Sequence, residues 1–205
     1  MSKPESLWQQ LISGAQSETM LQAAMDHAAL NLSDMVGQSI TIDVPGVTTV
    51  SINDMITYVG SPEAEIVGIY LLIDGELQGQ ALLMFSLHDA FYLIDLLMGR
   101  DVGETVELDD LSQSALAEVG NLMLAGFLNT LANISGKPLR PSPPAVVVDM
   151  LGAILNFIAA SVGATSDELV FVETIFKDTD RILEGRFWIL PDPSVFESSA
   201  SNLFT

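Results

Sequence analysis

Apolar and polar residues follow one another along this chain in an order that occurs twice. A long run of helical periodicity begins at residue 18 with "ETMLQAAMDHAALNLSDMVG", and a second begins after residue 109. Each is followed by a short run of strand character, "SITIDV" at 39–44 and "AVVVD" at 145–149, and then by a short apolar helix. The pattern therefore predicts helix, strand and helix in each half.

Two paired apolar runs in each half predict β-hairpins. In the first half, "EIVGIYLLI" leads into a turn at Asp74–Gly75, since Asp-Gly between apolar runs is a strong hairpin signal. In the second half, "DELVFVETIFK" leads into a turn at Asp178–Asp180. A further helix is expected to close each half, at 87–99 and at 192–204.

The two halves also align with each other at an offset of 99 residues. Residues 18–45 can be laid on 117–144, which places Gly37 on Gly136 and Pro45 on Pro144. We expect one domain over 1–205, built of two repeats at about 10–99 and 109–205 and joined by a polar linker at 100–110. The predicted fold class is α+β, with two pseudo-symmetric halves and two long helices packed on a shared antiparallel sheet.

Composition excludes several classes of protein. Hydrophobic residues make up 49% of the chain, which is typical of a folded domain. There is no cysteine, so disulfides and thiolate metal sites are excluded and a cytoplasmic location is expected. No signal peptide is expected at the N-terminus. The longest apolar stretch, 145–164, is interrupted by Asp149 and Asn156, so we interpret it as a strand that leads into a helix and not as a membrane span.

The net charge of −20 argues against nucleic acid and anionic lipid as partners, because both bind through basic clusters. No Lys or Arg occurs between Pro4 and Gly99. A protein partner fits this distribution better, although acidity that serves only solubility explains it as well.

The second long helix carries an unusual outer stripe. Its predicted core side is broad and apolar, formed by Leu116, Val119, Met123, Leu124, Phe127, Leu131 and Ile134. The opposite side carries small or polar residues: Ser114, Glu118, Asn121, Ala125, Asn129 and Ala132. Such a flat face is suited to contact with another protein. By spacing alone, however, a solvated face with polar residues placed by chance is the favoured interpretation.

The sequence "SALAEVGN", followed by 22 residues and Pro144, resembles the signature of the CheC-type chemotaxis phosphatases, a family that includes CheC, CheX and FliY-like proteins. The resemblance extends to the chain length and to the two-half organisation. It implies a phosphatase that accelerates hydrolysis of the aspartyl phosphate of a CheY-like response regulator. It implies no cofactor or metal of the chain's own, with Mg²⁺ held by the partner receiver domain.

The same resemblance assigns roles to individual residues. Asn121 would orient the attacking water, and Glu118 would engage the receiver's active-site lysine. Ser114 and Ala125 would contact the substrate protein, and Pro144 would have a structural role at the entry to a strand. The offset of 99 places Ala15, Thr19 and Gln22 opposite Ser114, Glu118 and Asn121, so the first half is expected to be a degenerate site.

Two alternatives stay open on the sequence. A non-catalytic module of the same fold could bind CheY-phosphate or act as a flagellar-switch-like component. A partner-holding scaffold could use the acidic first half as its contact surface. A CheD-like deamidase and a second copy of the chain, forming a homodimer, are further candidate partners.

Overall fold

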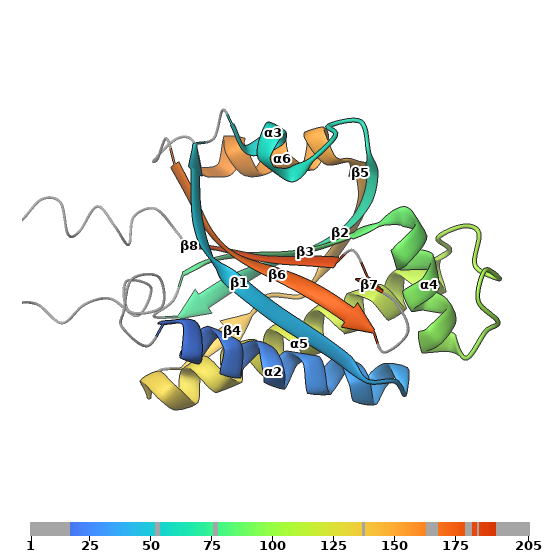
Figure 1. The fold of residues 1–205 in the computed structure, drawn as a ribbon, viewed down its shortest axis with the longest axis horizontal. Coiled ribbons are helices and arrows are strands. Elements are labelled where there is room, and N and C mark those ends of the chain that lie inside the picture. The colour runs from blue at the N-terminus through green and yellow to red at the C-terminus, as the bar shows by residue number, and fades with distance from the viewer. Residues whose placement is uncertain are drawn as a thin grey trace, which may run out of the picture.

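The structure is a computed structural model that describes residues 17–51, 54–75, 78–136, 138–162, 168–178, 182–183 and 185–191. Helices lie on both faces of a twisted layer of antiparallel strands, which forms two adjoining sheets, one of three strands and one of five (Figure 1). The helices are α2 (Ser17–Val36), α3 (Met55–Val59), α4 (Leu87–Met98), α5 (Asp110–Ser135) and α6 (Leu151–Val162). The strands are β1 (Ile40–Ser51), β2 (Glu65–Gly75), β3 (Gly79–Ser86), β4 (Leu139–Pro141), β5 (Ala145–Met150), β6 (Glu168–Asp178), β7 (Ile182–Leu183) and β8 (Gly185–Pro191).

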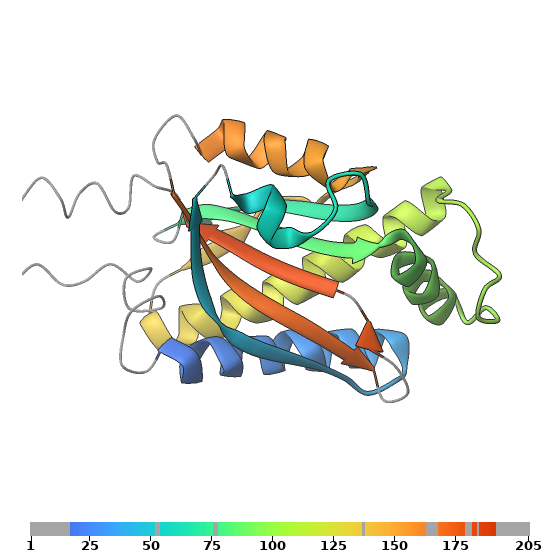
Figure 2. The same cartoon turned by 45° about the horizontal axis from the view of Figure 1, so that its top comes forward.

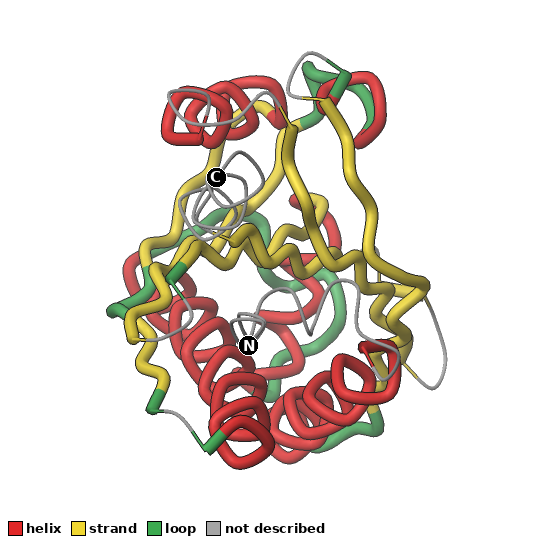
Figure 3. Tube along the Cα trace, turned by 90° about the vertical axis from the view of Figure 1, so that its left-hand side faces the viewer, coloured by secondary structure: helices red, strands yellow, loops and turns green. Residues whose placement is uncertain are grey.

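The two long helices lie side by side on one face of the sheet. α2 and α5 run antiparallel to each other beneath the strands, α4 lies at one end, and α3 and α6 cover the opposite face (Figures 1 and 2). The end-on view in Figure 3 shows the helix pair below the sheet and the short helices above it. Each face of the sheet has its own apolar core, because alternate side chains of a strand point to opposite faces. The predicted α+β fold with two long helices on an antiparallel sheet is confirmed.

The halves exchange strands. β1 of the first half pairs with β6 of the second, and β5 of the second half pairs with β2 of the first. β3 and β8, the last strand of each hairpin, pair with each other. β6 lies beside β8, where the Thr174 hydroxyl bonds both the N–H and the C=O of Phe187. This exchange supports the division into repeats at 10–99 and 109–205, which stays a prediction.

The long helices end in the same way. Gly37 and Gly136 both adopt the left-handed conformation, with φ of 71° and 68°. Each donates its N–H to the carbonyl four residues earlier, that of Ser33 or Ala132. Glycine adopts this C-cap conformation without the steric cost that other residues incur. The sequence alignment of these two glycines therefore corresponds to equivalent positions in the fold.

Three local predictions were wrong. β1 runs from Ile40 to Ser51, well past the predicted end at residue 44, because it pairs with β6 beyond an irregularity between Asp43 and Gly46. The predicted first hairpin is confirmed by the antiparallel pairing of β2 with β3, but its turn is misplaced: Asp74 and Gly75 are the end of β2 and pair with Arg140 and Leu139 of β4. Ile134, predicted to face the core, is 48% exposed because the last turn of α5 lies at the outer end of the helix pair (Figure 1).

Other predictions fall partly or wholly outside the described residues. The expected turn at Asp178–Asp180 includes only one described residue, Asp178, which is the last residue of β6. The expected closing helix at 192–204 lies outside the described residues. The apolar stretch 145–164 does form a strand followed by a helix, β5 and α6. Within the described ranges, α5 alone is long and apolar enough to cross a membrane, but half of that segment is buried in the fold, which is typical of a core helix.

The linker before α5 is held by a buried carboxylate. The side chain of Asp95 accepts hydrogen bonds from the N–H groups of Gly103 (2.7 Å) and Thr105 (2.9 Å). Burial pushes the pKa of Asp95 upward, but the hydrogen bonds from Thr105, Gly103 and Glu104 outweigh it and the pKa lies below its usual value. These hydrogen bonds fix the path of the chain from α4 into α5, and so the position of the outer stripe of α5.

Candidate active site

The start of α5 is set by a capping aspartate. Asp109 accepts a hydrogen bond from the N–H of Ser112 (2.7 Å), as an N-cap residue does. The hydrogen bonds from Ser112 hold the pKa of Asp109 below its usual value, so the carboxylate is ionised at neutral pH. Asp109 therefore fixes the residue at which α5 begins.

The apolar side of α5 faces the core and leaves the stripe outside. Six of the seven predicted core residues are fully buried: Leu116, Val119, Met123, Leu124, Phe127 and Leu131. On the opposite side, Ser114, Glu118 and Asn129 are exposed, whereas Asn121 and Ala125 are half-buried. Glu118 and Asn121 thus point away from the sheet, one helical turn apart.

A glycine on the buried side of α5 brings the helix close to the sheet. A Cβ atom on Gly120 would lie 2.5 Å from Cγ2 of Ile69, which belongs to β2. Any larger side chain at this position would therefore force Ile69 or α5 itself to shift. Because Gly120 lies between Glu118 and Asn121, this contact sets the height of both groups above the sheet.

The segment from Pro141 to Pro144 forms a wall beside the stripe. Together with Ser114, Ala117, Glu118 and Asn121, these four residues line an open groove on the surface. Ser142 anchors the wall to β2, because it donates its N–H to the carbonyl of Leu72 and accepts the Leu72 N–H on its hydroxyl oxygen (both 2.9 Å). The Ser142 hydroxyl in turn donates to the carbonyl of Pro143 at 3.1 Å.

The polar groups of this groove are available to a partner. Among the described residues, neither the carboxamide of Asn121 nor the carboxylate of Glu118 has a hydrogen-bond or ion-pair partner. Ser114 differs, since its hydroxyl donates to the carbonyl of Asp110 at 2.9 Å. An unbonded carboxamide can both accept and donate a hydrogen bond, and an exposed carboxylate can receive a cation. The groove can therefore hold a water molecule and bind a positively charged group.

The first half has a similar groove whose amide is already bonded. Glu18, Thr19, Gln22, Ala23, Asp26 and Val44 line it. Nε2 of Gln22 donates to the carbonyl of Ile42 (2.9 Å) and to Asp26 (2.8 Å), and its Oε1 accepts the N–H of Val44 (3.2 Å). Gln22 is therefore a structural clip between α2 and β1. Ala15, the third counterpart, lies outside the described residues.

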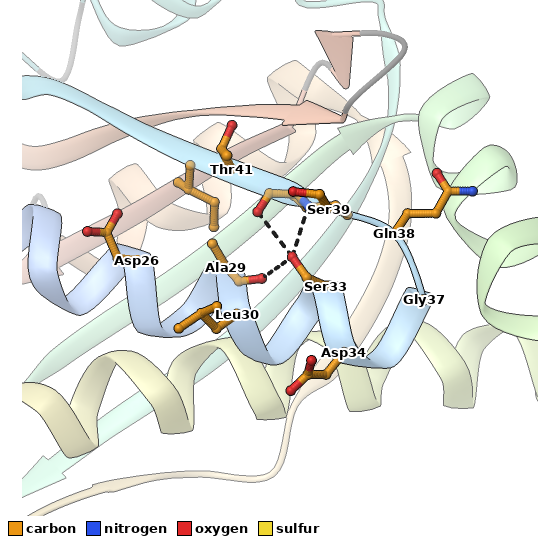
Figure 4. Close-up of a pocket in the computed structure, with 11 residues that line it drawn as sticks. Asp26, Ala29, Leu30, Ser33, Asp34, Gly37, Gln38, Ser39 and Thr41 are labelled. Atoms are coloured by element: carbon orange, nitrogen blue, oxygen red, sulfur yellow. Dashed lines mark hydrogen bonds between the residues drawn. The ribbon is translucent and has the colours of Figure 1, made fainter.

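A second side chain fastens α2 to β1 further along the helix. Figure 4 shows Ser33 at the centre of a hollow, where its hydroxyl donates to the carbonyl of Ala29 (2.7 Å) and bonds both the N–H and the C=O of Ile40 (2.9 and 3.1 Å). The residue of α5 at the same place is Ala132, which has no hydroxyl. The side chains of Gln22 and Ser33 thus both fasten α2 to β1. On α5, the side chain of Asn121 bonds no described residue, and Ala132 has no polar side chain.

The structure brings together four of the five residues predicted for the site. Ser114, Glu118, Asn121 and Pro144 line one groove, whereas Ala125 lies on the same stripe one turn beyond it. Sequence reasoning missed the wall residues Pro141, Ser142 and Pro143, although the proline-rich run "KPLRPSPP" was a signal for them. Over the described part of the chain, no three His, Asp or Glu side chains gather in a way that could hold a metal ion.

Comparison with known proteins confirms the resemblance on which these roles depend. The CheC-like family model matches residues 111–148, which include the whole stripe and Pro144. The CheY-P phosphatase CheC of Bacillus subtilis (strain 168) is 27% identical over 179 residues, covering 83% of this chain and 84% of that protein. The putative CheY-P phosphatase CheC1 of Halobacterium salinarum is 23% identical over 175 residues, covering 85% of this chain and 88% of that protein.

Solved structures share the fold. FliY of Thermotoga maritima superposes with a TM-score of 0.69 at 21% identity, covering 98% of this chain and 96% of that chain. CheX in the CheX–CheY–BeF3–Mg²⁺ complex of Borrelia burgdorferi gives 0.54 at 18% identity, covering 84% and 97%. The FliM middle domain of H. pylori gives 0.57 at 14% identity, covering 98% and 99%. At these identities the likeness shows the fold alone.

Proposed function

We propose that this chain is a protein aspartyl-phosphate phosphatase, which accelerates hydrolysis of the acyl phosphate on a CheY-like response regulator in chemotaxis signalling. The observation that carries the proposal is the unbonded carboxamide of Asn121 beside the exposed carboxylate of Glu118, on a flat helix face. The similarity to the CheY-P phosphatase CheC supports the same interpretation.

The chemistry requires little from this protein beyond positioning. An aspartyl phosphate is already activated, and the receiver supplies Mg²⁺ and a lysine next to it. A water held by Asn121 in line with the phosphorus would form the new P–O bond while the bond to the aspartyl oxygen breaks. The carboxylate of the aspartate leaves, inorganic phosphate forms, and the proton of the water passes to phosphate or solvent. No general base of this chain takes part, and the groove contains no histidine among its described lining residues.

Glu118 has the complementary role of holding the receiver. Its exposed carboxylate, without a partner among the described residues, would pair with the receiver's active-site lysine. Ser114 and Ala125 would contact the same partner on either side, and Pro144 would shape the wall of the groove. A cytoplasmic location accompanies this proposal. A CheD-like deamidase partner and a homodimer stay predictions.

The test is a phosphate-release assay on a phosphorylated receiver with Mg²⁺. Asn121→Ala should slow the accelerated reaction on the order of 100-fold, the scale of loss when one preorganised hydrogen-bonding group is removed. Gln22→Ala is the matched control, because it truncates the equivalent amide of the first half and should leave the rate unchanged. An Asn121→Ala protein as active as the wild type would reject the assignment.

A non-catalytic module is the second candidate. It is favoured by the fold shared with the FliM middle domain, at a TM-score of 0.57. On that account the protein binds a phosphorylated receiver without shortening the life of its acyl phosphate. Equal decay of the phosphoreceiver with and without the protein, combined with binding that requires phosphorylation, would favour this candidate over hydrolysis. Binding that is indifferent to phosphorylation would instead favour the scaffold.

A further inference from the structure

The two grooves differ in one backbone group. In the first half, the Gln22 carboxamide bonds both the carbonyl of Ile42 (2.9 Å) and the N–H of Val44 (3.2 Å). At the offset of 99 that aligns the halves, the residues corresponding to Ile42 and Val44 are Pro141 and Pro143. Both prolines line the groove of Asn121. Proline has no N–H, so residue 143 cannot donate the bond that Val44 donates.

We infer that Pro143 is a positioning residue, which keeps the carboxamide oxygen of Asn121 unbonded by withholding the backbone donor that captures the equivalent amide in the first half. Asparagine is also one methylene shorter than glutamine, and this shorter reach acts in the same direction. The inference rests on the proposed function for its consequence. An oxygen without an internal donor is available to the attacking water.

The wall itself does not depend on the missing N–H. The backbone and hydroxyl of Ser142 hold the segment against Leu72 at 2.9 Å, and the hydroxyl of Ser142 also bonds the carbonyl of Pro143. None of these bonds uses the side chain of residue 143. Pro143→Ala therefore preserves the anchors of the wall and introduces one donor at the place where the first-half strand has its own.

The experiment combines hydrogen exchange with kinetics in the full chain. Pro143→Ala is made alone and together with Asn121→Gln or Asn121→Ala, and exchange of the new amide at position 143 is followed by NMR in the three proteins. We expect this amide to exchange about tenfold more slowly in the single variant than in the double variant with Asn121→Ala. Exchange should be slowest in the double variant with Asn121→Gln, which recreates the clip of the first half.

The same single variant is then tested for activity. In the phosphate-release assay, Pro143→Ala should lower kcat about tenfold with KM unchanged, because the captured amide no longer orients water. Pro62→Ala controls for the loss of a proline ring, since Pro62 lies in the turn before β2, against Gly152 and away from the groove. Its rate should equal that of the wild type.

The two measurements separate this inference from the proposed function. Equal exchange of the amide at position 143 in the single variant and in both double variants would overturn the inference, even if the rate fell, because a looser wall would then explain the loss. The opposite result is also informative. If exchange of the amide at position 143 depends on the side chain at position 121 but the wild-type protein has no phosphatase activity, the role of Pro143 is upheld and the proposed function is rejected.

Discussion

The outer stripe of α5 and its counterpart on α2, which carries Thr19, Gln22 and Ser33, occupy corresponding positions in the two halves, yet their side chains are bonded in opposite ways. On α2, the amide of Gln22 is bonded to the strand beside it, and Ser33 fastens the same helix to Ile40. On α5, the amide of Asn121 has no partner among the described residues, and Ala132 replaces the serine. The polar side chains of α2 fasten that helix to β1, whereas those of α5 border an open groove.

This difference teaches that an amide on a helix face does not by itself identify a site. Both stripes retain a carboxamide at the same position, and the neighbouring backbone decides what it can do. Where the strand offers an N–H and a carbonyl two residues apart, the amide is consumed in a structural bond. Where prolines replace those residues, the amide stays available for chemistry.

The residues that pack beneath the two stripes also differ in size. Substituting one for the other should have the largest effect of the changes considered, a loss of stability. The counterpart of Gly120 at the offset of 99 is Leu21, which is 1% exposed. Gly120→Leu places a large side chain where even a Cβ would lie 2.5 Å from Ile69. We expect a loss of about 3 kcal/mol in the free energy of unfolding, measured by chemical denaturation, because a tightly packed contact cannot absorb the added volume.

Leu21→Gly is the reciprocal control, and it should destabilise the protein by creating a cavity under α2. A Gly120→Leu protein with wild-type stability would show that α5 has room to move and that its height above the sheet is not fixed by this contact.

A second site could be built on α2 if the comparison is correct. Thr19→Glu, Gln22→Asn and Val44→Pro together supply the carboxylate, shorten the amide and remove its internal donor. In a chain that carries Asn121→Ala, this triple change should restore about tenfold in rate, equivalent to about 1.4 kcal/mol of barrier. The phosphate-release assay measures it.

The informative control is the same protein with Val44 left in place, which should regain less activity because the backbone donor still competes for the amide. If the triple variant folds and binds the receiver but regains nothing, the wall of prolines does not explain the difference between the grooves.

Much of this architecture was predictable because it depends on local patterns. The 3.6-residue periodicity placed α5, and Gly37 and Gly136 marked the ends of both long helices. The spacing of Ser114, Glu118 and Asn121 placed them on one face, because residues four and seven apart share a side of a helix. Their outward orientation in the structure agrees with that prediction.

The remainder depends on contacts between distant segments. β1 continues past Pro45 and Gly46 because β6, which lies in the other half of the chain, pairs with it, and no local signal reports that partner. The clip of Gln22 and the wall at Pro143 likewise depend on how closely each helix lies against its strand. The sequence alone predicts that Gln22 belongs to a degenerate copy of the site, whereas in the structure its carboxamide is bonded to Ile42 and Val44.

Glu118 should contribute more to receiver binding than to the chemical step. We expect Glu118→Gln to raise KM about fivefold with little change in kcat, corresponding to about 1 kcal/mol for an exposed charge pair. The effect should shrink as salt is added, because salt screens exposed charges. Glu18→Gln is the matched control, since Glu18 is an exposed glutamate in the first-half groove. Equal KM values for the two variants would show that Glu118 does not contribute to receiver binding.

The smallest expected effect concerns stability. Here Gln22 should contribute more than Asn121, which is the reverse of their expected order in catalysis. Gln22→Ala removes the bonds to the carbonyl of Ile42 and the N–H of Val44, so it should lower the free energy of unfolding by about 1 kcal/mol. Asn121→Ala removes no bond to a described residue and should change stability by less than about 0.5 kcal/mol. Parallel denaturation curves of the two variants measure this contrast. An Asn121→Ala protein as destabilised as Gln22→Ala would mean that the second amide also serves the fold, and the opposition between the two stripes would no longer hold.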